Sequence, residues 1–354
     1  MAIYRPCLFA EKMNFSKLKK IAATGIAVTL TASFLTGCGI KSDTFILGKI
    51  FGLSSDEIFK IDDLTCSKSE YKLIFMNYVN KYKKDFGGKV DWNAKVDKDT
   101  TLKDFVMEKI KEDMTVKYTI AAMADSEGIK IDKDDMRSIN DVADKFYNSL
   151  SQSELEYTDA DLDTATVLYR NYYLADKVYN RVTEKVDETV SEEDARVIKI
   201  QYIRMSSDNT APDTIQKKLR SIAKKVKKGT ANFEKEAKQI SEDDSATKVI
   251  KKNEATTTLE KEAFNVNKNQ TSEIINDGND YYLIYCVDNY MKDETAKNKE
   301  NIIKKQKKAL FQKEYNSFLK DSSYDFNTSE WEDIVPEDIK DLKSSNFFSL
   351  YGDI

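Results

Sequence analysis

Apolar residues in the first half of the chain recur every three or four positions, the spacing that places them on one face of a helix. From residue 67 onward this spacing predicts four helices, over 67–86, 101–124, 132–150 and 158–186. Aromatic residues belong to each apolar face, and for side chains at helical spacing packing in a core is favoured over lining a groove for a ligand. We therefore expect a helical domain in this part of the chain.

The pattern changes after residue 190. VIKIQYIRM, residues 197–205, alternates as a half-buried strand does, and DYYLIYCVDNY, residues 280–290, is a second strand candidate. Between them, helical spacing predicts three shorter helices, over 213–228, 232–240 and 259–264. A β-α-α-α-β order inside an otherwise helical protein describes a small α+β domain. A last helix is predicted over 296–320, and the polar tail after it ends in SNFFSLY, which either docks on the protein or stays loose.

The first 37 residues have the pattern of a targeting segment. Lysines and an arginine precede the uncharged run 21–35, which is as long as a secretory signal core and shorter than the ~20 residues needed to span a membrane. The run ends in LTGC, residues 35–38, the pattern that lipoprotein signal peptidase reads. We predict a signal peptide over 1–37 and lipidation of Cys38. The alternatives are an ordinary signal peptide with an incidental cysteine, and a start at Met13 in place of Met1.

Lipidation at Cys38 has a physical consequence for where the protein works. Two acyl chains form a lasting membrane anchor, whereas one chain binds reversibly. The sequence after Cys38 contains no apolar run long enough to span a membrane. We therefore expect the folded part outside the cytoplasm, tethered to the outer face of the bacterial cytoplasmic membrane.

Composition narrows the chemistry. The net charge of −5 argues against nucleic acid as the main partner, and 40% hydrophobic residues are sufficient for a packed core. Histidine is absent, which excludes Ser-His-Asp and Cys-His catalysis and histidine metal sites. Cys66 and Cys286 are far apart in the sequence, and two buried thiols are a simpler interpretation than a disulfide. We predict no cofactor and no metal site.

Residues 191–290 resemble the parvulin, or PpiC-type, peptidyl-prolyl isomerase domain. The stretch 222–246 resembles the family's helix, glycine, aromatic residue, second helix and S-x-D run. The stretch 259–275 resembles its Ala-Phe pair and the turn that follows, with Asn269 at a glycine position, and DYYLIYCV resembles its closing strand. The helices before residue 190 resemble the chaperone domain of the PrsA/SurA group of extracytoplasmic foldases.

This resemblance implies an α+β fold, in which a mainly helical chaperone-like domain carries an inserted parvulin-like domain of antiparallel sheet and helices. It implies a tether and first strand region over 38–60, a helical chaperone domain over 61–190, the parvulin-like domain over 191–290, a C-terminal helix over 291–320 that packs back on the chaperone domain, and a tail over 321–354.

The chain departs from the family at the site where isomerases work. Active parvulins resemble one another in a pair of histidines beside a Cys or Asp, and alignment of the strands assigns Gln201 and Tyr282 to the two histidine positions. Residues 248–256, KVIKKNEAT, stand where the family has a glycine-rich turn. The resemblance further implies a peptide groove lined by Met205, Phe264 and Tyr282. Loss of both histidines indicates a site that has decayed or changed its role, with no confident catalytic residue.

Three functions remain open at this point. The leading hypothesis is a membrane-anchored foldase that holds unfolded or nascent secreted polypeptides and has weak or no isomerase activity. The second is an active prolyl isomerase that uses Gln201 and Tyr282 in altered roles. The third is a solute-binding lipoprotein of a transporter, although such proteins usually show repeated βα units, which this chain lacks. The client proteins and the oligomeric state are left open.

Overall fold

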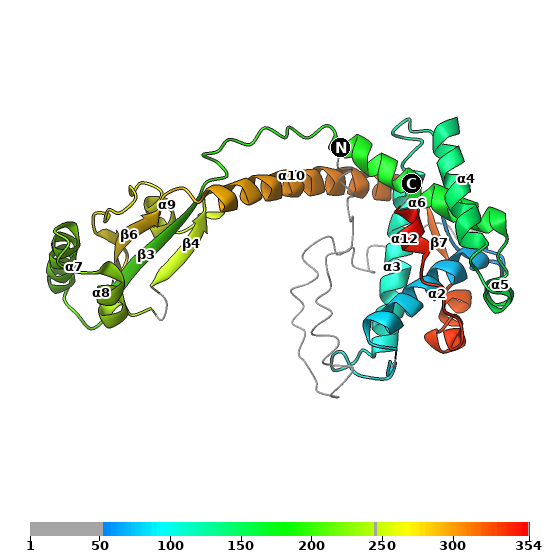
Figure 1. The fold of residues 1–354 in the computed structure, drawn as a ribbon, viewed down its shortest axis with the longest axis horizontal. Coiled ribbons are helices and arrows are strands. Elements are labelled where there is room, and N and C mark those ends of the chain that lie inside the picture. The colour runs from blue at the N-terminus through cyan, green and yellow to red at the C-terminus, as the bar shows by residue number, and fades with distance from the viewer. Residues whose placement is uncertain (1–51, 89, 244–245, 353) are drawn as a thin grey trace. The chain divides into compact units, whose positions relative to one another are not determined.

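The chain forms two compact units, and the second is inserted in the sequence of the first. The computed structural model describes residues 52–88, 90–243, 246–352 and 354, so the predicted signal peptide and Cys38 lie outside the described residues. Unit 1 comprises Met1–Lys185 and Leu310–Ile354, and unit 2 comprises Val186–Ala309. Helices with antiparallel sheets in both units confirm the predicted α+β class (Figure 1).

The helices of unit 1 begin where short polar side chains cap them. They are α2 (Lys68–Asp85), α3 (Leu102–Ala122), α4 (Lys133–Tyr147), α5 (Gln152–Thr158) and α6 (Leu162–Thr183). Each starts with a capping box, in which the N-cap side chain accepts from the third backbone N–H and that residue's side chain accepts from the N-cap N–H. These reciprocal bonds satisfy N–H groups that have no partner inside the helix.

One predicted boundary in unit 1 is wrong. The expected helix over 158–186 begins only at Leu162, because Asp159 adopts a left-handed conformation with φ of 50° and ends α5. Asp161 then caps α6. The apolar spacing continues across this break, so periodicity alone did not separate the two helices.

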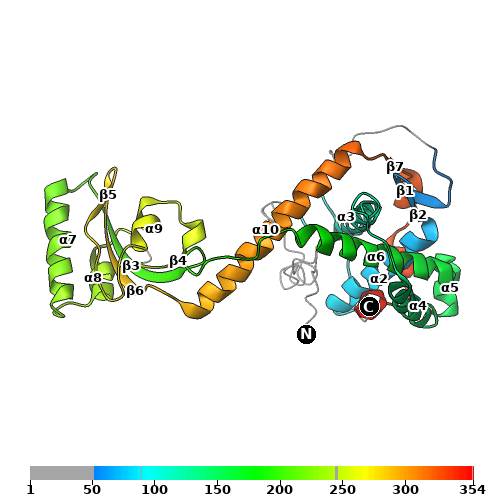
Figure 2. The same cartoon turned by 90° about the horizontal axis from the view of Figure 1, so that it is seen from above.

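A small sheet joins distant parts of the sequence in unit 1. Its strands β1 (Glu57–Ile61), β2 (Leu64–Ser67) and β7 (Tyr324–Phe326) pair antiparallel in the order β2-β1-β7. After β7 come α11 (Thr328–Glu332), the 3-10 turn η3 (Pro336–Ile339) and α12 (Phe347–Tyr351). The tail is docked, since Phe347 belongs to the main core of the unit, and α12 lies beside α4 and α6 in both views (Figure 1, Figure 2).

Unit 2 is a four-stranded antiparallel sheet with helices on both faces. The order is β4 (Thr247–Lys251), β3 (Val197–Ser206), β6 (Asp280–Asp288) and β5 (Ile275–Asp277). The helices are α7 (Pro212–Lys227), α8 (Phe233–Ile240) and α9 (Thr258–Ala263), and the 3-10 turn η2 (Lys252–Glu254) follows β4. One face packs on α7 and α8, and the other packs on α9. Edge strand β4 was not predicted, because its five residues alternate with lysines and look like loop sequence.

The helix predicted over 296–320 is α10 (Lys292–Asp321), which is longer than expected. Its residues up to Ala309 belong to unit 2, and those from Leu310 belong to unit 1. In unit 1, Phe311 and Tyr315 pack with residues of α3 and α6 such as Ile120 and Val178. Cys66 and Cys286 are both buried free thiols. Within the described part of the chain, no helix combines the length and apolar character needed to cross a membrane.

Candidate functional site

The register between β3 and β6 decides which side chains share a face of the inserted sheet. Arg204 stands opposite Tyr282, and Gln201 stands opposite Tyr285. Side chains alternate between faces along a strand, so Gln201 and Tyr282 lie on opposite faces. Tyr202, the neighbour of Gln201, lies on the same face as Tyr282. The assignment of Gln201 to a site shared with Tyr282 is therefore corrected: the structure brings Tyr202 there.

The predicted peptide groove is divided in the same way. Met205 is buried in the cluster that α7 and α8 cover. Phe264 and Tyr282 belong to the cluster on the α9 face, where the Arg196 guanidinium lies 5.1 Å from the centre of the Phe264 ring. Met205 and the other two residues therefore do not line one groove, and this expectation is wrong. Adjacent strand residues lie on opposite faces, so Met205 cannot share the face on which Arg204 and Tyr282 stand.

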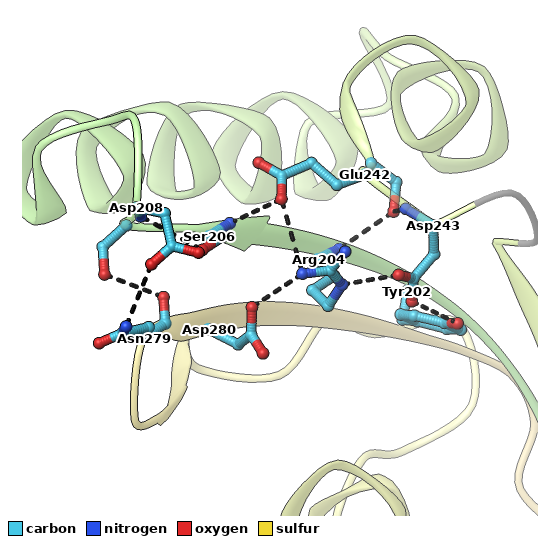
Figure 3. Close-up of polar contacts among 10 residues, drawn as sticks. Tyr202, Arg204, Ser206, Asp208, Glu242, Asp243, Asn279 and Asp280 are labelled. Carbon is cyan, nitrogen blue, oxygen red and sulfur yellow. Dashed lines mark hydrogen bonds and ion pairs between the residues drawn. The ribbon is translucent and has the colours of Figure 1, made fainter.

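The face that Tyr202 and Tyr282 share carries a cluster of charges centred on Arg204. The Nε of Arg204 donates to Asp243 Oδ1 at 2.6 Å, and its Nη1 donates to Asp280 Oδ1 at 2.8 Å (Figure 3). Glu242 Oε2 lies 3.5 Å from the same Nη1. The hydroxyl of Tyr202 donates to the second oxygen of Asp243 at 2.8 Å. We call these residues, Tyr202, Arg204, Glu242, Asp243 and Asp280, the Arg204 cluster.

Backbone pairing positions the acidic members of the cluster. The amide of Glu242 donates to the carbonyl of Arg204 at 3.0 Å, and the amide of Arg204 donates to Ser241 Oγ at 3.1 Å. Asp280 is the first residue of β6, opposite Ser206 at the end of β3. Asp243 and Asp280 therefore reach Arg204 from two different segments that β3 holds in register.

Burial and hydrogen bonds shift the pKa values of Asp243 and Tyr202 in the cluster and of Tyr282 beside it. Burial by itself raises the pKa of Asp243, but hydrogen bonds from Arg204 and Tyr202 outweigh it, so the pKa of Asp243 is lowered. Burial and then the bond to Asp243 raise the pKa of Tyr202 to about 12. Burial, followed by the charge of Asp280, raises the pKa of Tyr282. A general acid or base works best with a pKa near the operating pH, and neither tyrosine nor Asp243 meets this condition.

Sequence reasoning missed Tyr202, Arg204 and Asp243 as site residues. A signal was present, because an arginine inside an alternating apolar strand has to find carboxylate partners once it is partly buried. The acidic run at 242–244 offered them, but only the register shows which strand position meets it.

A separate hollow of about 540 Å³ lies at the connection between α7 and α8. Lys225, Asn232, Lys235, Glu236 and Gln239 are among its lining residues, so it is polar and is not part of the Arg204 cluster.

Comparison with known protein families identifies the inserted unit. Residues 198–288 match the profile of the rotamase family, the PPIC-type PPIASE domain. Unit 2 contains a PpiC-type domain. The match lies within the predicted range 191–290 and confirms that resemblance. A search among curated proteins found no relative of the chain.

Several solved structures resemble the chain. The foldase PrsA of Lactococcus lactis is 15% identical, with 83% of this chain and 98% of that chain covered and a TM-score of 0.31. PrsA of Bacillus anthracis is 18% identical, with 60% and 96% covered and a TM-score of 0.28. A structure from the study of PEB4 and Cj1289, two SurA-like chaperones of Campylobacter jejuni, is 11% identical, with 76% and 98% covered and a TM-score of 0.27. At these TM-scores the α+β description rests on the chain's own helices and sheets.

Proposed function

We propose that the protein is a membrane-anchored extracytoplasmic foldase that holds unfolded secreted polypeptides, and that its PpiC-type domain has weak or no isomerase activity. The observation that carries the proposal is the Arg204 cluster. It stands on the face of β3 and β6 that Tyr202 and Tyr282 share, in a domain type whose active members resemble one another in two histidines. This chain has no histidine at any position.

The physical argument concerns the environment of the prolyl amide. Rotation about a peptide bond has a barrier of ~18–20 kcal/mol, which arises from its partial double-bond character. A site that lowers this barrier has to remove the amide from water and stabilise a twisted geometry. Arg204 and its three carboxylate partners keep this face charged, and Tyr202 already donates its hydrogen to Asp243. This face is therefore poorly suited to enclosing an apolar proline ring.

Membrane anchoring in this proposal depends on the sequence alone, since LTGC and the uncharged run before it lie outside the described residues. Metabolic labelling with palmitate checks it. We expect the label to enter the full chain and to be absent from the Cys38→Ala variant, which should leave the membrane fraction. Equal labelling of both forms would contradict lipidation at this cysteine.

A client assay tests the holding activity. An unfolded protein diluted from denaturant aggregates and scatters light, and we expect the purified protein to suppress this scattering at near-stoichiometric amounts. An unrelated protein of similar net charge is the control. Scattering that is unchanged at a several-fold excess of the protein would refute the proposed function.

An active isomerase is the second candidate. One observation favours it: Asp243 accepts a hydrogen bond from the Tyr202 hydroxyl on the face shared with Tyr282. Protease-coupled isomerisation of an Ala-Pro peptide separates the two. We expect the uncatalysed rate for the wild type and a higher rate for Tyr202→His with Tyr282→His, because imidazole can bond to Asp243 and titrates near neutral pH. Gln201→His with Tyr282→His is the matched control and should gain nothing, since Gln201 lies on the other face.

A further inference from the structure

The C-terminal tail of the protein is held in unit 1 as a peptide is held in a binding groove. Phe347 is 0% exposed and its ring enters a cage of aromatic side chains. It stacks on Tyr169 with ring centres 4.3 Å apart, and its edge contacts with Tyr172 and Phe146 are at 5.3 and 5.4 Å. The next residue, Phe348, packs on Tyr78 at 4.5 Å. Two adjacent aromatic residues thus anchor the tail.

Residues 342–346, just before this aromatic pair, have no regular secondary structure, and groove side chains bind their backbone. The carboxylate of Glu154 accepts hydrogen bonds from the amides of Lys343 and Ser344 at 2.9 and 2.7 Å. The Nδ2 of Asn80 donates to the carbonyl of Ser344 at 2.9 Å. Two amides and one carbonyl of this irregular segment are therefore bound by side chains of α5 and α2.

The same kind of recognition continues at the anchor residue. The amide of Phe347 donates to Asn77 Oδ1 at 3.1 Å, and the hydroxyl of Tyr169 donates to the Phe347 carbonyl at 3.0 Å. Asn77 is 0% exposed and its Nδ2 donates to the carbonyl of Leu73, which fixes its oxygen toward the tail. Every peptide has amides and carbonyls, so these contacts recognise the backbone and leave the choice of sequence to the aromatic cage.

The groove has polar groups that need a chain in it. Without the tail, the oxygen of Asn77 and much of the carboxylate of Glu154 would lose their partners, and an unpaired buried polar group is costly. The hydroxyl of Tyr172, at the wall of the cage, has no hydrogen-bond partner among the described residues even with the tail in place. The groove therefore has hydrogen-bonding capacity that its present occupant does not use.

We propose that the groove formed by α2, α4, α5 and α6 is a binding site for client segments that contain two adjacent aromatic residues, and that residues 343–351 occupy it as an internal ligand. The inference rests on the proposed function, because it states where a held polypeptide binds. A client competes with the tail for the same main-chain and aromatic contacts. Only a client that binds the groove tightly enough to displace the tail is therefore held.

Cleavage of the tail tests the proposal without preventing folding. A recognition site for a specific protease, inserted between Lys340 and Asp341 of the full chain, allows the protein to fold with its tail and then frees the tail. The probe is a fluorescein-labelled peptide of residues 341–354, followed by anisotropy. We expect the cleaved protein to bind this probe and the uncleaved protein to bind it much more weakly. A probe with Phe347→Ala should bind at least about tenfold more weakly, as expected for an aromatic anchor in a closed pocket.

Three results would overturn the proposal. A cleaved protein that keeps its own tail and excludes the probe after dilution would make the tail a fixed part of the core. Loss of the far-ultraviolet circular dichroism signal on cleavage would do the same. Elution of the uncleaved protein as a dimer that becomes monomeric on cleavage would assign the groove to the tail of a second copy.

The aggregation assay separates this inference from the proposed function. If saturating probe abolishes suppression by the cleaved protein, the groove is the client site. If suppression persists at saturating probe, the foldase function stands and the groove is not where clients bind, which overturns the inference. If the probe binds but the protein never suppresses aggregation, the groove binds peptides and the proposed foldase function fails.

Discussion

The Arg204 cluster of unit 2 and the tail groove of unit 1 use similar polar groups in opposite ways. In the cluster, Arg204 bonds to side chains from its own sheet and from the segment paired with it, so the charges are satisfied within the domain. In the groove, Glu154 and Asn77 accept hydrogen bonds from backbone amides of the C-terminal tail, which is distant from both in the sequence. Charged groups that are already paired with one another have few hydrogen bonds left for a ligand. Groups that bind the backbone of the tail can instead bind the backbone of another peptide.

The difference also appears in what surrounds the polar groups. The groove combines them with a closed aromatic cage, which supplies apolar area and excludes water. The side chain of Arg204 keeps 25% exposure, so water screens its ion pairs and the region stays hydrated. For the proposed function, the PpiC-type domain is therefore the less favourable of the two regions for binding an unfolded chain.

The largest expected effect comes from the anchor of the tail. Phe347→Ala removes a fully buried ring and should lower the free energy of unfolding of unit 1 by up to about 3–5 kcal/mol, the range for such truncations in a core. Thermal unfolding followed by circular dichroism measures the loss. Phe348→Ala is the matched control, because Phe348 is only half-buried and should cost clearly less. Equal losses for the two variants would contradict the role of Phe347 as the anchor.

A smaller effect is expected in the Arg204 cluster. Arg204→Met leaves three carboxylates without their shared cation and should cost about 1–3 kcal/mol in the stability of unit 2, as for charged groups that lose a partner. Denaturant unfolding gives the change. Arg220→Met, at an exposed position of α7, is the control and should be nearly neutral. A loss no larger than that of the control would mean that the cluster contributes nothing measurable to folding.

The smallest effect is a pH dependence of tail docking. Burial by itself raises the pKa of Glu154, but hydrogen bonds from the amides of Ser151, Ser344 and Lys343 outweigh it and lower the pKa. A carboxyl whose pKa is lowered by folding stabilises the folded protein above its ordinary pKa, and this contribution is lost as the pH falls through the folded pKa. The melting temperature of the wild type should therefore exceed that of Glu154→Gln at pH 7, and this difference should shrink as the pH falls to 3. A constant difference between the two proteins would exclude this linkage.

The sequence was sufficient to predict most helices and the inserted domain, and the reasons are local. The helices over 67–86 and 101–124 follow from apolar spacing and capping pairs that lie within a few residues of one another. The inserted domain follows from the change to alternation at 197–205 and from a match that extends over residues 198–288. In contrast, β1 and β7 are short strands more than 250 positions apart, and nothing in either stretch indicates the other.

The errors at the site also have a physical origin. Adjacent strand residues point to opposite faces, so Gln201 cannot share a site with Tyr282, whereas Tyr202 lies on its face. Met205 and Phe264 are both apolar residues of the inserted domain, but only the packing of α7, α8 and α9 divides them between two clusters. Docking of SNFFSLY was left open because its partners, among them Tyr169 and Glu154, come from helices distant in the sequence.

By itself, the sequence determined that no histidine is available for catalysis, where apolar spacing is typical of helices and of strands, and the type of the inserted domain. Composition and short-range spacing do not depend on the fold. The tertiary structure decided which side chains share a face, that Arg204 is enclosed by carboxylates and that the tail lies in an aromatic groove. These features depend on strand register and on helices meeting across long sequence separations. Contacts of that kind become visible only when the chain is packed.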